Sequence, residues 1–313
     1  MLVTDVKLYL EDLRANGSAK KTQVMYEKWL NEFCKQMKIK DNYDLEKIKK
    51  SDIQNYRIYL EERGLSNSTI NSYTAPVVSL YKFLYNEDFI KKDPTKGLRF
   101  KKVPVKPMTF LNEDEAKRLI QNCYNNRQKA MFFLMISTGM RIGEVVNLEM
   151  GDIKGEKVFI TNAKRGETRY IPVGKTCLKY INNYIGKTPK LDNNGERFLD
   201  RNGDVVYEDG ERVPAVVSKT GGKNLLFTSN KGSATDVANT NKELGRICKK
   251  AKIEKNISCH KLRSTAATLQ SIHGTNIKNI QTMLGHQSTQ MTARYVQMVD
   301  KNYQEQIANN GLW

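Results

Sequence analysis

The sequence has no long apolar stretch. No run of about 18 apolar residues occurs, which is the length that a membrane-spanning helix needs. The first residues, Met-Leu-Val-Thr-Asp-Val-Lys-Leu, contain no basic stretch followed by an apolar core, as a secretory signal would. We therefore expect no membrane partner and a cytoplasmic location.

Cysteine and histidine are also scarce, with five and three residues in a chain of 313. No two cysteines form a Cys-x-x-Cys pair, so neither a disulfide framework nor a zinc site is indicated. We expect most cysteines to be small buried apolar residues; they are Cys34, Cys123, Cys177, Cys248 and Cys259. The sequence also lacks a Gly-x-x-x-x-Gly-Lys-Ser/Thr nucleotide-binding loop. We expect no metal and no cofactor.

Acidic residues are outnumbered by basic ones. The chain has 34 Asp and Glu against 52 Lys and Arg, a net charge of +18. An excess of this size favours a polyanionic partner, and without a membrane that partner is nucleic acid. A basic cytosolic protein with no such partner is the alternative. The length of 313 residues predicts two domains.

The first 90 residues are predicted to form an all-α domain. Four amphipathic helices are expected, over residues 3–16, from Ser18 onward, from Ser51 to Gly64, and from Ser66 or Ser68 through Leu84. Pro76 lies inside the last pattern and should kink that helix or shift its start. Lys20 and Lys21 interrupt an apolar face. They are either solvated or in contact with DNA phosphates.

Residues 91–108 are predicted to be an extended interdomain linker. Three prolines and a glycine argue against a regular element there. Seven Lys or Arg stand against one Asp, which suggests that the linker also runs along DNA. The expected DNA-contacting residues of the linker are Arg99, Lys101, Lys102 and Lys106.

Residues 109–313 are predicted to be a second domain that mixes helices with a small sheet. Expected helices cover residues 113–123, 129–137, about 236–252 and 277–284, with Asn112 and Glu115 capping the first. Residues 157–161 and 168–173 flank a turn with glycine, which predicts an antiparallel hairpin. The fold class is therefore mainly α with a small antiparallel β-sheet (α+β).

Residues 187–224 resemble an insertion. Four turn signals predict irregular structure, with a β-hairpin in which Phe198-Leu199 and Val205-Val206-Tyr207 flank Asn202-Gly203. Seven basic and seven acidic residues balance one another in this segment, which argues against a main DNA contact. The segment is either a tolerated surface insertion, which we favour, or a protein–protein contact.

Residues 259–297 hold the densest group of candidate reactive side chains. His260 and Arg263 are three residues apart, so they project from one helix face and can address one anion. His286 follows Gly285 at a predicted helix end, and Tyr295 lies on the last predicted helix. His273 has no motif partner and is interpreted as structural. Arg141 follows the glycine turn at Gly139 after a predicted buried helix, a position suited to entering a cleft.

These motifs resemble the tyrosine recombinases, the phage-integrase family. The resemblance rests on Thr-Gly-x-Arg-Ile-x-Glu at 138–144, on Lys164 followed by Arg169-Tyr-Ile-Pro-Val, and on His-x-x-Arg, Leu-Gly-His and Tyr within 259–297. Leu-Ser-x-Ser-Thr-Ile-Asn at 65–71 is similar to the family's four-helix core-binding domain. The resemblance covers roughly residues 3–186 and 225–300. It is closest to Xer- or Cre-like members without an arm-binding domain.

The resemblance implies a catalytic set: Arg141, Lys164, His260, Arg263, His286 and Tyr295, with Glu144 in support. Tyr295 would be the nucleophile, His260 its base and Lys164 the acid. Arg165 is the rival for the acid and a candidate DNA contact, but its pKa above about 12 makes it a poor proton donor. Glu144 would position its neighbours rather than react.

The implied function is site-specific DNA recombination through a 3′-phosphotyrosyl intermediate, without metal or ATP. The implied partners are double-stranded DNA with inverted-repeat core sites, a homotetramer on that DNA, and accessory recombination proteins. The setting would be a bacterial cytoplasm, on the nucleoid, with the gene bacterial or carried by a phage. The alternatives are a type IB topoisomerase-like enzyme that relaxes DNA, or a catalytically idle DNA-binding regulator. The tail, residues 298–313, could pack on its own domain or on a neighbouring subunit.

Overall fold

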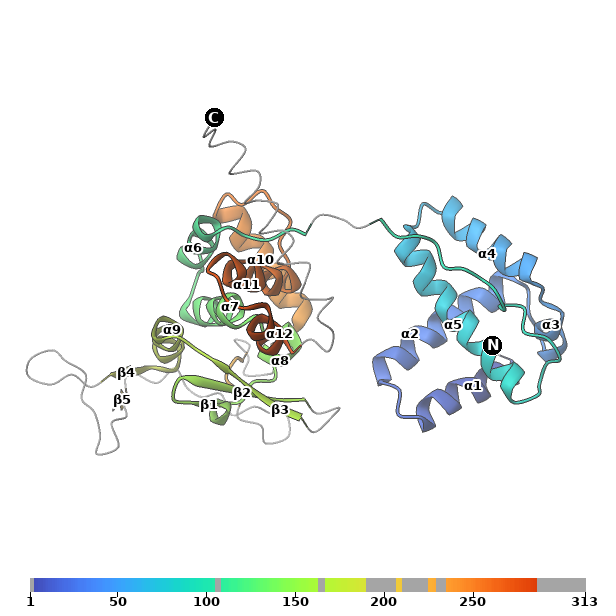
Figure 1. Ribbon diagram of the computed structural model, residues 1–313, viewed down its shortest axis with the longest axis horizontal. Helices are drawn as coiled ribbons and strands as arrows, with labels where there is room; N and C mark the ends of the chain where they lie inside the picture. The colour runs from blue at the N-terminus through green and yellow to red at the C-terminus, as the bar shows by residue number, and fades with distance from the viewer. Residues whose placement is uncertain are drawn as a thin grey trace, which may run out of the picture. The chain divides into compact units, whose positions relative to one another are not determined.

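The computed structural model of this chain describes residues 3–104, 108–162, 167–189, 207–209, 225–228 and 235–285. It divides into two compact units, Met1–Lys106 and Pro107–Trp313 (Figure 1). Helices dominate both units, and the second also contains a small antiparallel sheet. The predicted fold class is therefore confirmed. No described helix is long and apolar enough to cross a bilayer.

The described part of the first unit contains five helices. They are α1 (Thr4–Ala15), α2 (Lys20–Gln36), α3 (Asn42–Lys47), α4 (Lys50–Glu62) and α5 (Asn67–Asn86). Four helices were predicted, and α3 was missed. Only Leu45 of its six residues is buried, so it has no apolar periodicity to detect. Its start is stabilised by the Asp41 side chain, which accepts a hydrogen bond from the Asp44 N–H.

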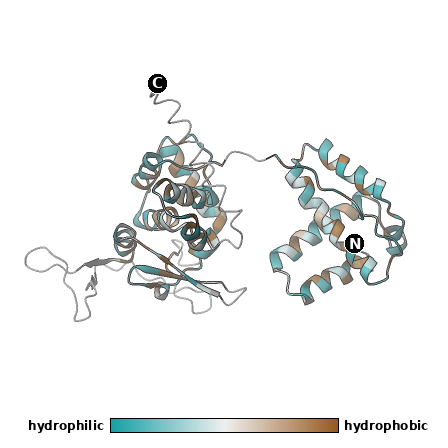
Figure 2. Ribbon diagram, viewed as in Figure 1, coloured by the Kyte–Doolittle hydropathy of each residue, from teal (hydrophilic) through white to brown (hydrophobic). Residues whose placement is uncertain are grey.

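Aromatic side chains pack among aliphatic ones in the core of the first unit. Phe33, Tyr56 and Tyr81 are fully buried, and the two tyrosine rings meet Phe33 edge-on. Figure 2 shows hydrophobic and hydrophilic residues alternating along these helices, as amphipathic packing requires. Helix α5 runs without interruption through Pro76 and begins directly after its Ser66 cap. Pro76 therefore does not shift the start of the helix, which was one of the two predicted alternatives.

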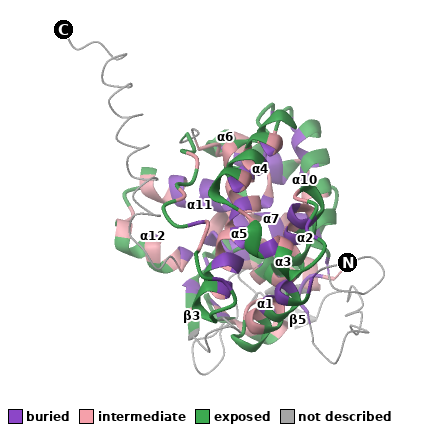
Figure 3. Cartoon of the chain, turned by 90° about the vertical axis from the view of Figure 1, so that its right-hand side faces the viewer, coloured by how far each residue is buried: buried purple, intermediate pink, exposed green. Residues whose placement is uncertain are grey.

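The second unit is built around the buried helix α7. Its helices are α6 (Glu113–Gln121), α7 (Asn126–Thr138), α8 (Ile142–Val145), α9 (Lys175–Ile185), α10 (Val237–Lys250), α11 (Cys259–Ile272) and α12 (Ile277–Leu284), with a 3-10 turn at Met150–Asp152. Helix α7 packs against α9 and α11, and most of its residues are buried (Figure 3). The predicted cap of α6 is confirmed, because Asn112 and Glu115 each accept from the other's backbone N–H at 2.8 Å.

The strands of the main sheet follow one another in sequence: β1 (Ile153–Lys154), β2 (Lys157–Asn162) and β3 (Glu167–Pro172). The predicted hairpin of β2 and β3 is confirmed, with Val158 opposite Ile171 and Ile160 opposite Arg169. Opposed residues of an antiparallel pair lie on the same face of the sheet. Val158, Ile160 and Ile171 are buried in the main core. Arg169 therefore lies on the core-facing side.

Within the predicted insertion, 187–224, the structure describes two short strands. Strand β4 (Lys187–Pro189) pairs antiparallel with β5 (Tyr207–Asp209). The predicted hairpin put the strand ending at Tyr207 opposite Phe198-Leu199, and those two residues lie outside the described ones. The observed partner of Tyr207 is Pro189. The described pairing joins residues 18 to 22 positions apart in the chain, which a search for the nearest turn does not find.

The five cysteines are confirmed as buried and free. Burial raises the pKa of each thiol, to about 11 for Cys34 and to about 12 for Cys177. These thiols are therefore protonated and unreactive at neutral pH. No group of three His, Cys, Asp or Glu side chains suited to a metal ion occurs among the described residues.

Candidate active site

A tight turn after α7 places Arg141. Helix α7 ends at Thr138, and Gly139 follows in the left-handed region at φ 63°. The Thr138 hydroxyl donates to the Leu134 carbonyl at 2.6 Å and accepts from the Met140 N–H at 3.4 Å. Arg141 then forms the N-cap of the short helix α8. The turn ends α7 and fixes where the Arg141 side chain starts.

Other parts of the chain pack closely against this turn. A Cβ atom at Gly139 would lie 2.6 Å from Leu284 Cδ2 and 3.4 Å from Ala266 Cβ. The first of these distances is shorter than any stable non-bonded contact between two carbon atoms. Glycine is required at this position for its conformation and also for the space it leaves. Helix α11 and the end of α12 are therefore seated directly on the turn.

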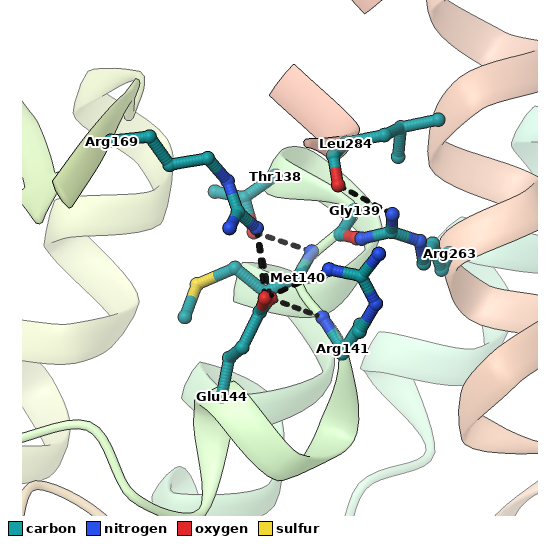
Figure 4. A network of polar contacts seen from close by, with 8 residues as sticks. All are labelled: Thr138, Gly139, Met140, Arg141, Glu144, Arg169, Arg263 and Leu284. Carbon is teal, nitrogen blue, oxygen red and sulfur yellow. Dashed lines mark hydrogen bonds and ion pairs between the residues drawn. The ribbon is translucent and has the colours of Figure 1, made fainter. Parts of the chain in front are cut away.

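The Arg263 side chain joins these segments. It is 2% exposed, and Nη1 donates to the Gly139 carbonyl at 2.7 Å while Nη2 donates to the Leu284 carbonyl (Figure 4). Gly139 and Arg263 are 124 residues apart in the sequence. Hydrogen bonds from a charged donor are stronger than neutral ones, especially where water is excluded. Arg263 thus holds the turn before Arg141 to the residues just before His286.

Glu144 stabilises the other side of the turn. Its carboxylate accepts from the Arg141 backbone N–H at 2.8 Å and from Arg141 Nη1 at 3.1 Å. Burial alone would raise the pKa of this carboxyl, but the Arg141 N–H and the charges of Arg169 and Arg141 together lower it below its usual value. Glu144 is therefore ionised at neutral pH. It orients Arg141, whose side chain is 48% exposed.

Arg169 is a member of this site that the sequence reasoning did not select. Its Nη2 lies 3.0 Å from both carboxylate oxygens of Glu144 (Figure 4). Its guanidinium also covers Gly285, where a Cβ would approach Cζ to 3.0 Å. The sequence did carry a signal. Arg169, Ile171 and Val173 share one face of a two-residue repeat, so the arginine occupies a core-facing position.

Gly285 ends α12 at the predicted residue. It adopts φ 62°, the left-handed conformation common at helix C-termini. A side chain at Gly285 would collide with the Arg169 guanidinium. The backbone conformation of Gly285 and its packing against Arg169 thus both set the direction in which the chain leaves α12.

Comparison with known proteins assigns the chain to a family. Residues 109–302 match the model described as the phage integrase family, and residues 6–88 match the phage integrase N-terminal SAM-like domain. The chain belongs to the phage integrase family. It is a tyrosine-type site-specific recombinase, and the resemblance inferred from its motifs is confirmed.

Two relatives of this integrase are Xer recombinases. It is 26% identical over 285 residues to tyrosine recombinase XerD of Oceanobacillus iheyensis, covering 89% of this chain and 88% of that one. It is 28% identical over 279 residues to tyrosine recombinase XerC of Caldanaerobacter subterraneus subsp. tengcongensis, covering 86% and 71%. These relatives favour the recombinase over the topoisomerase-like or regulator alternatives.

Solved integrase structures share the fold. A lambda integrase dimer bound to a COC' core site superposes with a TM-score of 0.71 at 16% identity, covering 94% of each chain. The Tn1549 transposon integrase in complex with transposon right end DNA gives 0.70 at 19% identity, covering 97% of this chain and 99% of that one.

Of the other predicted catalytic residues, His260 lies among the described residues of the integrase. His260 lies in the first turn of α11 and is exposed, while Arg263, on the next turn, faces the core. The Cys259 N–H beside His260 donates to Asn241 Oδ1 at 3.0 Å, which anchors that end of α11. Lys164, His286 and Tyr295 lie outside the described residues, as do Arg165 and Lys106. His273, expected to be structural, pairs with Glu113 at 2.8 Å.

The predicted DNA-contacting residues of the first unit differ in their surroundings. Lys20, Lys21, Arg99 and Lys102 are exposed. Lys101 instead pairs with Glu61 at 2.6 Å, and its side chain is only 22% exposed. Its backbone N–H and carbonyl both bond to the Asn71 side chain, at 2.9 and 2.8 Å. The predicted linker, 91–108, is therefore held on α5 at Lys101.

Proposed function

We propose that this integrase cuts and rejoins DNA with Tyr295 as the nucleophile. The Tyr295 oxygen attacks a backbone phosphorus, a 3′-phosphotyrosyl bond forms, and the bond to the 5′-oxygen breaks. The observation that carries the proposal is the Arg263–Gly139 hydrogen bond, which joins the two arginine motifs into one site. An arginine with only a surface role would not be buried, as Arg263 is, beneath the turn that carries Arg141.

The two arginines are proposed to stabilise the pentacoordinate transition state. Negative charge gathers there on the non-bridging phosphate oxygens, and positioned N–H donors stabilise that charge most where water is excluded. Arg141, half-exposed above the turn, is suited to reach the phosphate directly. Arg263 supplies charge from beneath the turn. His286 donates a further hydrogen bond in this scheme.

Proton transfers complete the proposed chemistry. A tyrosine hydroxyl has an ordinary pKa of about 10, so Tyr295 needs a base, and His260 at the exposed start of α11 is the candidate. Lys164 gives a proton to the leaving 5′-oxygen. The phosphotyrosyl bond conserves the energy of the phosphodiester, so a 5′-hydroxyl of a partner strand can reverse the step. Neither metal nor ATP enters this scheme.

The basic surface is proposed to hold double-stranded DNA. Residues 1–90, the basic segment 91–108 and the catalytic domain, 109–313, would each contact the core site. One structural neighbour is a lambda integrase tetramer bound to a Holliday junction. We propose the same assembly on inverted-repeat core sites for this chain, with accessory proteins directing it. The biological role would be integration and excision of a mobile element, or dimer resolution, in a bacterial cytoplasm.

A DNA substrate nicked close to the cleavage site tests the proposal. Cleavage releases a short oligonucleotide that diffuses away, so the covalent complex accumulates and separates on a denaturing gel. We expect an adduct with the wild-type protein and none with Tyr295→Phe, while DNA binding is unchanged. Tyr303→Phe, a change of the same kind eight residues later in the chain, serves as the control. An adduct formed by Tyr295→Phe would show that the nucleophile is another residue.

A further inference from the structure

We propose that Arg169 is a positioning residue of the recombination site. It acts through Glu144 on Arg141, and through Gly285 on the chain that enters His286. The inference rests on the proposed function, because it concerns the rate of the cleavage step. It assigns a role to a residue on the sheet, outside the six positions proposed to be catalytic.

Arg169 occupies an unusual position for a charged side chain. It lies on the core-facing side of β3, opposite the buried Ile160, and its side chain is 20% exposed. Placing a guanidinium there is costly unless its charge is paired. An apolar residue would satisfy the sheet at lower cost. The arginine therefore does something at this position that packing alone does not require.

Glu144 is the first target of Arg169. The carboxylate lies between two arginines, with Arg169 Nη2 at 3.0 Å from each oxygen and Arg141 Nη1 at 3.1 Å. Without Arg169, a mostly buried carboxylate would lose one of its cationic partners and be drawn toward the remaining one. The Arg141 guanidinium would then be held by Glu144 when it should turn to a phosphate. Arg169 balances that attraction.

Gly285 is the second target. The Arg169 Cζ, Nε and Nη1 atoms lie 3.0–3.1 Å from the position of a Cβ at Gly285, so the guanidinium lies flat against this residue. The neighbouring Leu284 carbonyl accepts from Arg263. A closed circuit of contacts results, which we call the turn network: Arg263, Gly139, Arg141, Glu144, Arg169, Gly285 and Leu284. Arg169 is the one member that the sheet supplies.

A purely structural role is the competing explanation, and the same unit contains a matched pair for comparison. Arg127 Nη2 donates to both Glu243 oxygens at 2.8 and 2.7 Å, and the Arg127 side chain is 10% exposed. This pair lies at the other end of α7, about 16 Å from the turn by helix rise. Losing either pair should destabilise the fold. Only the loss of Arg169 should alter the turn network.

The test compares Arg169→Lys with Arg127→Lys in the full chain. Both changes keep the charge and remove the planar fork. The measurements are the melting temperature, the dissociation constant for an intact core site, and the single-turnover rate of adduct formation on the nicked substrate at saturating protein. We expect Arg169→Lys to slow the adduct about 10- to 100-fold. Its dissociation constant should stay within about threefold of wild type, and Arg127→Lys should change neither quantity beyond about threefold.

A double-mutant cycle separates action through Glu144 from general damage. If Arg169 acts through Glu144, the combined slowing in the variant Glu144→Gln/Arg169→Met should be smaller than the product of the two single effects, and the slowing that remains beyond Glu144→Gln alone is the contribution of the Gly285 contact. The double variant also avoids the lone buried charge that could unfold Arg169→Met. If the double variant is slowed by the full product of the two single-variant factors, the inference is overturned. So would an Arg169→Lys rate within about twofold of wild type, or equal slowing by Arg127→Lys.

The outcomes also distinguish this inference from the proposed function. Normal adduct formation by the wild type and by Arg169→Lys overturns the positioning role and leaves the recombinase chemistry intact. Failure of the wild type to form any adduct overturns the proposed function, and the positioning role falls with it.

Discussion

At the scale of single residues, the two arginines of the site have unequal surroundings. Arg141 is half-exposed and held by Glu144, whereas Arg263 is buried and bonded to the Gly139 and Leu284 carbonyls. Their different burial suggests different roles: Arg141 reaches outward, whereas Arg263 also holds the Gly139 turn to the end of α12.

Gly139 allows a test of this close packing. Gly139→Ala should destabilise the protein by about 2 to 5 kcal/mol, because alanine there is overpacked against Leu284 and strained at positive φ. The matched control is Gly143→Ala. No atom lies within 4 Å of a Cβ at Gly143, which is in helix α8, so alanine should be neutral or slightly stabilising. Urea denaturation measures both, and equal stabilities would contradict the packing described.

At the scale of elements, α5 holds residues 101 and 102 of the basic segment 91–108. Asn71 bonds both backbone groups of Lys101, and the Asn67 side chain donates to the Lys102 carbonyl at 2.9 Å. Both asparagines belong to the stretch 65–71 that resembled the family's first domain. Their structural role is to hold an irregular segment that has no helix or strand of its own. Arg99 and Lys102 are thereby presented outward in a defined register.

Asn71→Ala should release this segment. Losing two hydrogen bonds costs about 1 to 2 kcal/mol, which raises the population of the detached segment roughly 5- to 30-fold. Trypsin cleavage after Lys101 and Lys102 should accelerate accordingly, as followed by mass spectrometry, while the melting temperature changes little. Asn86→Ala, at the exposed last residue of the same helix, is the control. Unchanged cleavage in Asn71→Ala would mean that the segment is held by other contacts.

At the scale of the whole molecule, the net positive charge is the property that matters most for DNA binding. A net charge of +18 predicts DNA binding that depends strongly on salt, since each neutralised phosphate releases counterions.

The logarithm of the association constant for a core site should fall linearly with the logarithm of salt concentration. Lys102→Gln should reduce the slope by about 1. Lys101→Gln should have a smaller effect, because Lys101 is already neutralised by Glu61. Fluorescence anisotropy across a salt series measures all three proteins. A flat response of the wild type would contradict binding through a basic surface.

The sequence alone determined the fold class, most helix boundaries and the family. Those depend on local signals: apolar periodicity, caps such as Asn112 with Glu115, helix-ending glycines, and reactive residues inside short motifs. The short helix α3 was missed because one buried leucine makes no pattern. The partner of β5 was missed because strand pairing is not local.

Only the tertiary structure decided which residues meet. The burial of Arg263 beneath Gly139, the covering of Gly285 by Arg169, and the pairing of Lys101 with Glu61 join residues far apart in the chain. Such contacts leave no periodic trace in the sequence, because they depend on how whole elements pack. The motifs named several members of the turn network one by one, but the pairing of Arg169 on β3 with Glu144 on α8 became visible only in three dimensions.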